Sequence, residues 1–346
     1  MTDVPSATIL DVAKLAQVSP STVTHALNGK RPVGRDTKKR ILSAIDTLGY
    51  IPSHSASHLR KGKSGIIGCY TTDITEAFSN KIVRGIEQGL AGSGLSMLLV
   101  SGLEFGNDPS RAYRFLLSHN IEGLLLCYHI PAIFDIFKDT GNSKIPIISI
   151  NMKLEGISAI LPDNVSGGMI AADHLYASGM RHPAMICGPL DRISVEDRLQ
   201  GFQGRVKELG LKFNQNYFVF GDYSYDHGYK MSYQLVNRDS KIDGIFCAND
   251  YIAAGAINRL TEMGYKIPDD IRIIGFDNRD FSQFWQIPIS TFEQPLEKMG
   301  FMGISALRCL ISTPMGPQEP LILQSRLIPR SSTIGHKFYK KTLEKV

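Results

Sequence analysis

Between residues 66 and 310, short apolar runs alternate with longer amphipathic stretches, and this alternation constrains the fold more than any other feature. Apolar runs of this length predict buried strands, and the amphipathic stretches predict helices that cover them. Repeated strand–helix–strand units imply an α/β protein with parallel sheets covered on both faces. About 280 residues exceed one comfortable sheet, so we expect two lobes. The predicted strands span residues 66–70, 96–101, 123–128, 146–150, 184–187, 217–220, 244–247 and 272–276. The predicted helices between them span residues 78–91, 110–118, 167–177, 194–209, 225–236, 252–262 and 296–310.

The first 50 residues lack this alternation and favour three short helices instead. Thr8, with Asp11 three positions later, gives the first helix a start that resembles a capping box. Gln17 and Val18 supply a tight turn before the second helix. Two short helices joined by such a turn and followed by a third predict a helix-turn-helix unit, whose second helix enters the major groove of DNA. These helices are predicted at residues 8–17, 19–27 and 35–48.

The second of these helices combines one apolar stripe with an unusual polar face. Ser19 is a good N-cap, and Pro20 suits the first helical position. Apolar residues recur at helical spacing at Val23, Ala26 and Leu27, so one side of the helix can be buried. The remaining positions carry short, uncharged groups typical of hydrogen bonding to a close partner. They are Ser21, Thr22, Thr24, His25 and Asn28.

Charge is distributed unevenly along the chain. Residues 1–63 hold ten Lys and Arg against four Asp, a net charge of +6, whereas the whole chain carries +5. A basic head on a nearly neutral body is typical of a nucleic-acid-binding module joined to a second domain. Lys14, Lys30 and the basic run 38–40 would attract phosphates without reading sequence. The alternative is a solvated N-terminal face.

The head also resembles a known family. "TILDVAKLAQVSPSTVTHALNG" followed by "ILSAIDTLGYIPSHSASHLRKG" is similar to the start of lactose-repressor (LacI/GalR) family transcription factors. This resemblance implies that Pro20, Ser21 and His25 read bases in the major groove. It implies phosphate contacts for Thr22, Thr24 and Asn28, and we expect Thr8 and Ser19 at the same DNA surface. The alternative for His25 is a local role in capping or packing.

The resemblance extends through a hinge to operator DNA. Residues 53–59 match the family's hinge helix, with Ser53 and Ala56 among the expected DNA-binding residues. Leu59 matches the leucine that wedges into the minor groove at the centre of a palindromic site, which is physically sensible because an inserted apolar side chain kinks the duplex. The resemblance therefore implies a pseudo-palindromic operator and a protein that binds it as a homodimer. The basic, short tail "IGHKFYKKTLEKV" differs from the family's leucine-rich tetramer-forming tail, so we expect a dimer.

The rest of the chain resembles the family's two-lobe core, which is similar to periplasmic binding proteins. The matching motifs are "AFSNKIVRGIE", "RLQGF", "FCANDYIAAGAI" and "IIGFDN". We expect three chain crossings between the lobes, near residues 161–163, 290–292 and 315–321. The predicted domains are a head (1–50), a hinge and linker (51–63) and a core (64–346). Within the core, the first lobe is predicted at 64–161 and 292–318, and the second at 162–291 and 319–335.

Polar residues follow several predicted strands, where ligands of such folds bind. Asn151, Asn249 and Asp277 each follow an apolar run, and Arg198 lies early in a predicted helix. An Arg fork, an amide and a carboxylate are good partners for vicinal hydroxyls. Tyr223 is placed to lie against a sugar ring, with Phe78 closing the opposite lobe. The alternative is that Asn249 and Asp277 only cap the helices that follow them. The full set of expected effector-binding residues is Phe78, Tyr128, Asn151, Ser194, Arg198, Tyr223, Asn249, Asp277 and Gln294.

These residues predict a small-molecule effector, with a sugar or sugar derivative as first choice and a nucleobase or nucleoside as second. Family members that bind sugars often have Asp where this chain has Asn151. Because an amide donates as well as accepts hydrogen bonds, the effector is expected to present an acceptor or a negative charge there. The function that follows is a transcriptional regulator, expected to repress a catabolic operon under control of this effector.

Other classes of protein fit the sequence less well. An enzyme with a fused DNA-binding head is disfavoured, because no nucleophile elbow, Walker A loop, metal-spaced His and Cys, or strand-linked GxGxxG motif is found. We therefore expect no catalytic residues, no metal and no cofactor. A transport binding protein would share the core but should carry an export signal and no helix-turn-helix. The five Cys form no CxxC pair, and four of them fall on predicted strands as core residues. The expected location is the cytoplasm, with no membrane contact.

Overall fold

The computed structural model describes residues 7–28, 31–50, 63–106, 108–127, 145–212 and 214–334. The chain divides into two compact units, Met1–Gly65 and Ile66–Val346, called here the head and the core. The predicted hinge helix at 53–59, with Ser53, Ala56 and Leu59, lies outside the described residues, as does Tyr128. Among the described residues, no helix is both long and apolar enough to span a bilayer.

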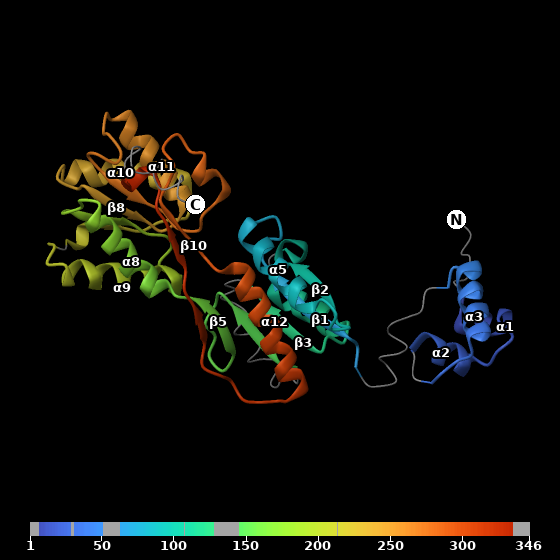
Figure 1. Ribbon diagram of the computed structural model, residues 1–346. Coiled ribbons are helices and arrows are strands. Elements are labelled where there is room, and N and C mark those ends of the chain that lie inside the picture. The colour runs from blue at the N-terminus through green and yellow to red at the C-terminus, as the bar shows by residue number, and fades with distance from the viewer. Residues whose placement is uncertain are drawn as a thin grey trace. The chain divides into compact units, whose positions relative to one another are not determined.

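The described residues of the head form three helices, at the positions where the sequence predicts a helix-turn-helix (Figure 1). Helix α1 (Ile9–Leu15) joins α2 (Pro20–Asn28) through a turn in which Gln17 adopts a left-handed conformation with φ 52°. Helix α3 (Arg35–Leu48) packs against both and ends at Gly49, which is also left-handed. The arrangement is a helix-turn-helix. Its core consists of Val12, Ala13, Ala16, Val23, Ile41 and Ala44.

The first lobe of the core is built on a six-stranded sheet with the order β11-β5-β4-β3-β1-β2, and every neighbouring pair is parallel. Helices α5 and α12 cover one face, where Ile82 and Leu307 lie in the core, and α6 covers the other with Ala112 and Leu116. Its strands are β1 (Ile66–Thr71), β2 (Ser96–Ser101), β3 (Gly123–Leu126), β4 (Ile147–Ile150), β5 (Ser158–Pro162) and β11 (Leu321–Leu323). The helices among its described residues are α5 (Ala77–Leu90), the 3-10 helix η1 (Gly102–Phe105), α6 (Pro109–Ser118) and α12 (Leu296–Ser312).

The second lobe is built on a four-stranded parallel sheet with the order β7-β6-β8-β9. Figure 1 shows α8 and α9 on one face of this sheet and α10 and α11 on the other. Its strands are β6 (Pro183–Ile186), β7 (Phe218–Val219), β8 (Gly244–Cys247) and β9 (Arg272–Ile274). Its helices are α8 (Asn164–Ala177), α9 (Ile193–Glu208), η2 (Gln215–Tyr217), α10 (Tyr225–Arg238), α11 (Asp250–Glu262) and η3 (Asp280–Gln283). The two parallel, doubly covered sheets confirm the α/β, two-lobe prediction.

Three segments carry the chain between the lobes, and one lies later than the sequence predicts. The first runs from β5 into α8 at Pro162–Asp163, and the second follows β10 (Thr291–Glu293), which pairs with β12 (Arg326–Ile328) in an antiparallel ribbon. The predicted third crossing at 315–321, with the second lobe resuming at 319, is wrong by several residues. Strand β11 still pairs with β5 in the first lobe, so the chain crosses between Leu323 and Arg326.

Close packing of α12 on α5 fixes the part of the first lobe that borders the second. A Cβ on Gly85 would lie 1.9 Å from the carbonyl oxygen of Glu297, and one on Gly300 would lie 2.1 Å from that of Ile82. The two helix backbones therefore approach closely at positions where only glycine fits.

The four strand-associated Cys, namely Cys69, Cys127, Cys187 and Cys247, are buried as predicted, whereas Cys309 is exposed.

Candidate functional site

A cavity of about 710 Å³ lies between the two lobes of the core, at the carboxyl ends of strands from both sheets. In doubly wound folds this is the edge at which ligands bind, and the volume suits a small molecule. The first lobe contributes the residues after β1, β4 and β5. The second contributes the starts of α8 and α9 and the loops after β7, β8, β9 and β10.

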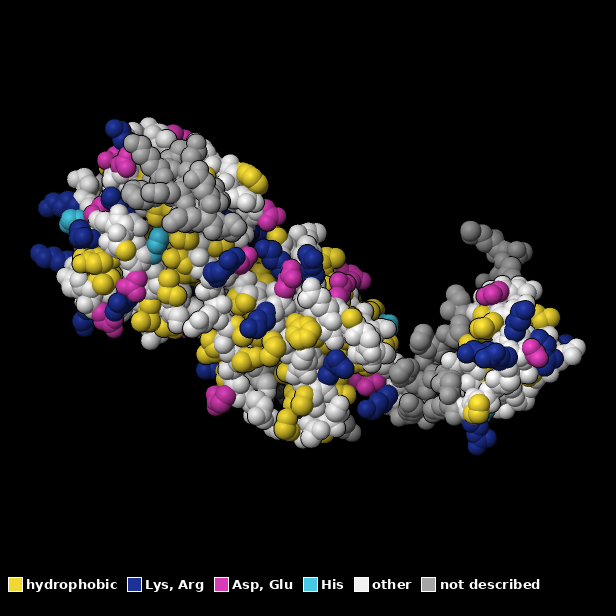
Figure 2. Space-filling view, viewed as in Figure 1, with side chains coloured by type: hydrophobic (Ala, Val, Ile, Leu, Met, Phe, Trp, Pro, Cys, Tyr) yellow, Lys and Arg dark blue, Asp and Glu magenta, His cyan; other side chains and the backbone are white. Residues whose placement is uncertain are grey.

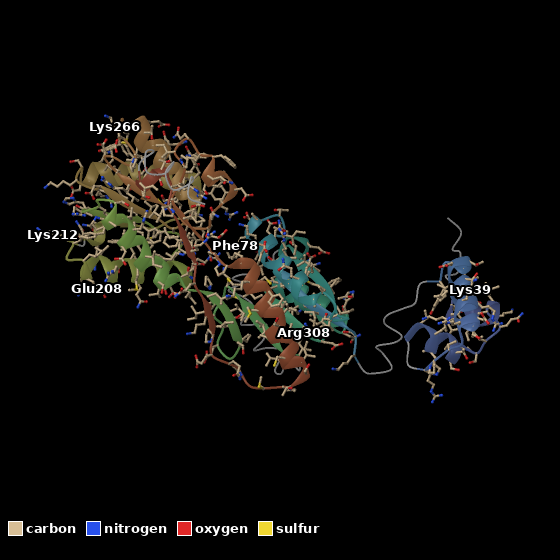
Figure 3. All side chains as sticks on the ribbon, viewed as in Figure 1. Lys39, Phe78, Glu208, Lys212, Lys266 and Arg308 are labelled. Carbon is tan, nitrogen blue, oxygen red and sulfur yellow. The ribbon has the colours of Figure 1, made fainter. Side chains whose placement is uncertain are left out.

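Eight of the nine predicted effector-binding residues line this cavity; the ninth, Tyr128, lies outside the described residues. Figure 3 shows Phe78 at the side of the first lobe that borders the second. The structure thus brings together residues separated by more than 200 positions in the sequence. The eight are Phe78, Asn151, Ser194, Arg198, Tyr223, Asn249, Asp277 and Gln294.

Arg198 is the best fixed of these side chains. It is buried, and its guanidinium lies 3.6 Å from the centroid of the Phe276 ring. Its Nε donates to Asn164 Oδ1 at 2.9 Å, and its Nη1 donates to the Ala248 carbonyl at 2.6 Å. Burial lowers the pKa of Arg198, and the nearby Asp277 carboxylate opposes this effect. Because neither bond uses Nη2, this nitrogen is the one placed to donate to a ligand.

Asp277 and Gln294 form the acceptor-rich part of the wall. Gln294 Nε2 donates to Asp277 Oδ1 at 2.7 Å, which orients both side chains. Burial raises the pKa of Asp277, while Arg198 and Arg279 lower it. Among the described residues, Gln294 Oε1 has no hydrogen-bond partner although it is buried. A buried acceptor without a partner is costly, so a ligand that donates a hydrogen bond there would relieve the cost.

Asn249 lines the cavity but uses its side chain within the protein. Its Oδ1 accepts from the backbone N–H of Ile252 at 2.8 Å as the N-cap of α11, and its Nδ2 donates to the Tyr223 carbonyl at 3.1 Å. The capping alternative therefore describes Asn249. It does not describe Asp277, which precedes no α-helix and has a left-handed φ of 102°.

The cavity is also lined by charged residues that sequence reasoning missed. Among the described residues, the lining contains four cationic side chains and four carboxylates, so their formal charges cancel. Arg279 Nη1 lies 3.2 Å from Glu76 Oε2, an ion pair that joins the second lobe to the first across the cavity. Arg192 and Asp197 lie in the same segment as Ser194 and Arg198, and that proximity could have revealed them. The eight charged residues are Asp73, Glu76, Lys153, Arg192, Asp197, Arg198, Asp277 and Arg279.

The polar face of α2 forms a second candidate site, on the head. Ser19, Pro20 and Ser21 are exposed, and His25 is partly exposed. Ser19 Oγ lies 2.7 Å from Ser21 Oγ and 2.8 Å from Thr22 Oγ1, so the hydroxyls at this helix start form one cluster. Thr24 Oγ1 donates to the Pro20 carbonyl at 3.0 Å. Hydroxyls clustered at a helix N-terminus suit contact with a phosphate.

Basic residues surround this face on the head. Several exposed Lys and Arg side chains lie on the visible side of the head in Figure 2, and Figure 3 labels Lys39 on α3. The predicted DNA-binding residue Thr8 caps α1, with its Oγ1 2.7 Å from Asp11 Oδ2, so its side chain is already engaged. The exposed cations among the described residues of the head are Lys14, Arg31, Arg35, Lys38, Lys39, Arg40 and Lys63.

The fold and these two sites define a class of protein: a helix-turn-helix head joined to a periplasmic-binding-protein-like core with a ligand cavity. Sequence profiles agree with this division. Residues 8–53 match "Bacterial regulatory proteins, lacI family", and residues 172–333 match "Periplasmic binding protein-like domain". Among the described residues, no cluster of three or more His, Cys, Asp or Glu could hold a metal ion.

Full-length relatives extend the match over almost the whole chain. The HTH-type transcriptional repressor PurR of Photorhabdus laumondii is 30% identical over 336 residues, covering 96% of this chain and 98% of that protein. The ribose operon repressor of Escherichia coli K12 is 31% identical over 331 residues, covering 94% and 99%. The chain belongs to the lacI family of bacterial regulatory proteins, and it is a DNA-binding transcriptional regulator.

Solved structures agree. The Lac repressor bound to ONPG in its repressed state superimposes with a TM-score of 0.82 at 25% identity, covering 94% of this chain and 99% of that one. The CelR–cellobiose complex gives a TM-score of 0.68 at 26% identity, again covering 94% and 99%.

Proposed function

We propose that this regulator binds a pseudo-palindromic operator as a homodimer and represses a catabolic operon until an uncharged small molecule in the cleft changes its DNA affinity. The charge balance of the cavity lining carries the effector half of this proposal. Among the described residues, four cations matched by four carboxylates offer a phosphate ester or a carboxylate no excess positive charge, whereas they suit a neutral ligand with both donors and acceptors.

The polar groups of the second lobe favour the same kind of ligand. Asp277 and Gln294 present acceptors, and Arg198 presents a donor. Vicinal hydroxyls match this set because each both donates and accepts, so a sugar is the first choice. A nucleobase also carries adjacent donors and acceptors and remains the second. The related proteins fit both choices, since one is named for a ribose operon and another was solved with cellobiose.

The proposed operator binding is supported by the residues of the head. Pro20, Ser21 and His25 are exposed or partly exposed on α2 and are the proposed base readers, with Thr22, Thr24 and Asn28 as phosphate contacts. A lacI-family structure solved as a dimer on its operator supports the same arrangement for this chain. The proposal includes no catalytic activity, and it places the protein in the cytoplasm, where its DNA target lies.

A thermal-shift experiment tests the effector half. A small-molecule extract of a bacterium that carries the gene is separated by anion exchange into a neutral and an anionic fraction. Sugars and nucleobases are also added singly, beside their phosphate esters. The neutral fraction and at least one neutral compound should raise the melting temperature, because a ligand that binds only the folded state stabilises it.

The Asp277→Asn variant should respond far less, whereas Asp226→Asn, at an exposed carboxylate in the first turn of α10, should respond as the wild type does. Stabilisation by the anionic fraction alone would contradict a neutral effector. No stabilisation by either fraction would contradict an effector cleft.

A further inference from the structure

The loop after β9 holds an unusual backbone conformation beside the cavity. Asp277 has a φ of 102° and Asn278 a φ of 47°, so two consecutive residues other than glycine lie in the left-handed region. Such conformations cost free energy and persist only when the surrounding structure holds them. This loop carries the Asp277 carboxylate and the Arg279 guanidinium, both of which line the cavity.

Asp250 forms hydrogen bonds with both ends of this loop. It lies at the first position of α11, is fully buried, and is not among the described residues that line the cavity. Its backbone N–H donates to the Phe276 carbonyl at 2.9 Å, and its Oδ2 accepts from the Arg279 N–H at 2.7 Å. The residue thus holds the chain immediately before Asp277 and two residues after it.

The other carboxylate oxygen of Asp250 joins the loop to a segment that crosses between the lobes. Asp250 Oδ1 lies 2.6 Å from Thr291 Oγ1 on β10, and the same hydroxyl accepts from the Asn278 N–H at 3.2 Å. Arg330, beyond β12, donates to Asn278 Oδ1 at 2.6 Å. Asn278 is therefore held by Thr291 and Arg330, which are not among the described residues that line the cavity, whereas its neighbour Asp277 lines the cavity.

An ordinary helix-capping role does not explain Asp250. The N-cap of α11 is Asn249, whose side chain accepts from the helix, whereas the Asp250 side chain bonds the loop and β10. A Cβ on Gly275 would lie 2.3 Å from Asp250 Oδ1, so the loop backbone passes directly over this carboxyl group.

We propose that Asp250 is a positioning residue of the effector cleft, which holds the Asp277 carboxylate and the Arg279 guanidinium in place without touching the effector. The assignment rests on the proposed function of the cleft. Its consequence is that effector affinity depends on a side chain outside the cavity, through the conformation of residues 276–279.

The ionisation of Asp250 offers a way to test this role. If the carboxyl group holds the loop, loop order should change with pH, whereas a purely structural role predicts no such change. The pKa of Asp250 is raised to about 8, mainly by burial and also by the Asp277 carboxylate, while Thr291, the Arg279 N–H and Arg330 oppose this rise. Cys247 on β8 and Arg198 on α9 also face this region. Near pH 7 the carboxyl group is therefore mostly protonated, while Oδ1 accepts from the Thr291 hydroxyl and Oδ2 accepts from the Arg279 N–H. Above pH 8 it becomes a second buried negative charge beside Asp277.

The sign of the pH effect follows from linkage. A carboxyl group whose pKa is raised on folding contributes stability at low pH that is lost as the pH rises toward its folded value. The Asp250→Asn side chain keeps one acceptor for the Arg279 N–H but cannot ionise. The wild type should therefore lose loop order, and with it effector response, progressively as the pH rises from about 4 to about 8, and Asp250→Asn should not.

The experiment compares wild type, Asp250→Asn and Asp250→Ala in the full chain, with Asp226→Ala as the control for an acidic residue in the first turn of a helix. Hydrogen exchange of a peptide containing residues 276–279 reports loop order, since the Asn278 and Arg279 N–H groups both donate within the network. The neutral metabolite fraction serves as probe in a thermal-shift assay at each pH.

At pH 7, Asp250→Ala should lower the protection factors of these amides by about tenfold or more and lose most of the thermal shift. Asp250→Asn and Asp226→Ala should retain both. Unchanged loop protection in Asp250→Ala would overturn the proposal, as would equal pH dependence of protection in wild type and Asp250→Asn. If Asp250→Ala does not fold, the comparison of wild type with Asp250→Asn decides. If the neutral fraction fails to stabilise the wild type, the proposed effector is wrong. The hydrogen-exchange measurements on residues 276–279 then still test whether Asp250 positions the loop.

Discussion

Among the residues that line the cavity, Arg198 provides a hydrogen-bond donor, and Asp277 and Gln294 provide acceptors. Arg198 is fixed by two hydrogen bonds and a stacked ring, so it loses little further freedom when it binds a ligand. Asp277 is oriented by Gln294, whose own oxygen has no partner among the described residues. Donor and acceptor positions are thus set before a ligand arrives, which favours affinity.

Replacing Asp277 by Asn should weaken the effector by about 1–3 kcal/mol, or roughly tenfold to a hundredfold in Kd. The amide can still accept from Gln294 but offers a donor where the ligand also donates. Calorimetry with a compound found in the thermal-shift screen measures this loss. Full affinity in Asp277→Asn would place the effector elsewhere.

On the head, His25→Ala should cost about 1–3 kcal/mol on the preferred operator and reduce discrimination at one base pair per half-site. His25 lies on the polar face of α2, whereas the exposed Lys38 lies on α3 and is expected only to attract phosphates. Lys38→Ala is therefore the control and should weaken all sequences alike. Anisotropy titrations against single-base-pair operator variants distinguish the two. A uniform loss in His25→Ala would show that His25 does not read a base.

Residue types at strand ends predicted the cavity better than they predicted individual roles. Asp277 and Arg198 were identifiable because a carboxylate after an apolar run and an Arg early in a helix are unusual in a buried setting. Asn249 shows the limit, since the same position that borders the cavity also caps α11. Glu76 and Arg279 are adjacent only because the two lobes meet, and no local pattern reports a contact between residues 203 positions apart.

At the scale of elements, local patterns predicted the strands and helices that carry their own hydrophobic signal. Strands β2 and β8 and helix α3 have the predicted bounds. Strands β10, β11 and β12 have three residues each and escaped prediction, because long-range pairing defines them rather than their own sequence. The third crossing between the lobes was predicted too early for the same reason, since the pairing of β11 with β5 keeps residues 321–323 in the first lobe.

The ion pair between Glu76, at the N-cap of α5, and Arg279, after β9, links an element of each lobe. The Glu76 side chain is 53% exposed and that of Arg279 17%, so the pair should contribute at most about 1 kcal/mol. Glu76→Gln should therefore reduce effector affinity by up to about fivefold and make this affinity less sensitive to salt.

Glu87→Gln, at an exposed position on the same helix, is the matched control. A double-mutant cycle with Arg279→Gln isolates the pair. Additive effects of the two substitutions would show that the pair contributes nothing to ligand binding.

At the scale of the whole molecule, the head and the core differ in charge, so salt should affect their ligand binding differently. The first 63 residues carry a net charge of +6, whereas the formal charges of the described residues that line the cavity cancel. Affinity for DNA should therefore depend steeply on salt, whereas affinity for a neutral effector should depend on it only weakly.

If each head neutralises about three phosphates, the slope of log K against log salt for a dimer should be about −5. Lys38→Ala should make that slope shallower by about 1–2, because it removes one phosphate contact from each head. Anisotropy titrations over a range of salt concentrations measure both slopes. Operator binding that does not vary with salt would contradict the assignment of the basic head to phosphates.

The central claim is that occupancy of the cleft controls the DNA affinity of the head. An effector shifts operator binding only if it binds the two states of the protein with different affinity, and the coupling is then reciprocal. The most direct test is a fluorescence-anisotropy titration of labelled operator, with and without the active neutral compound, in wild type and in Asp277→Asn. The wild-type operator affinity should change with the compound. The variant should bind the operator equally well without it and respond only at roughly tenfold to hundredfold higher concentration. An equal response of both proteins at the same concentration, or no response of the wild type to a compound that binds the cleft, would contradict the account.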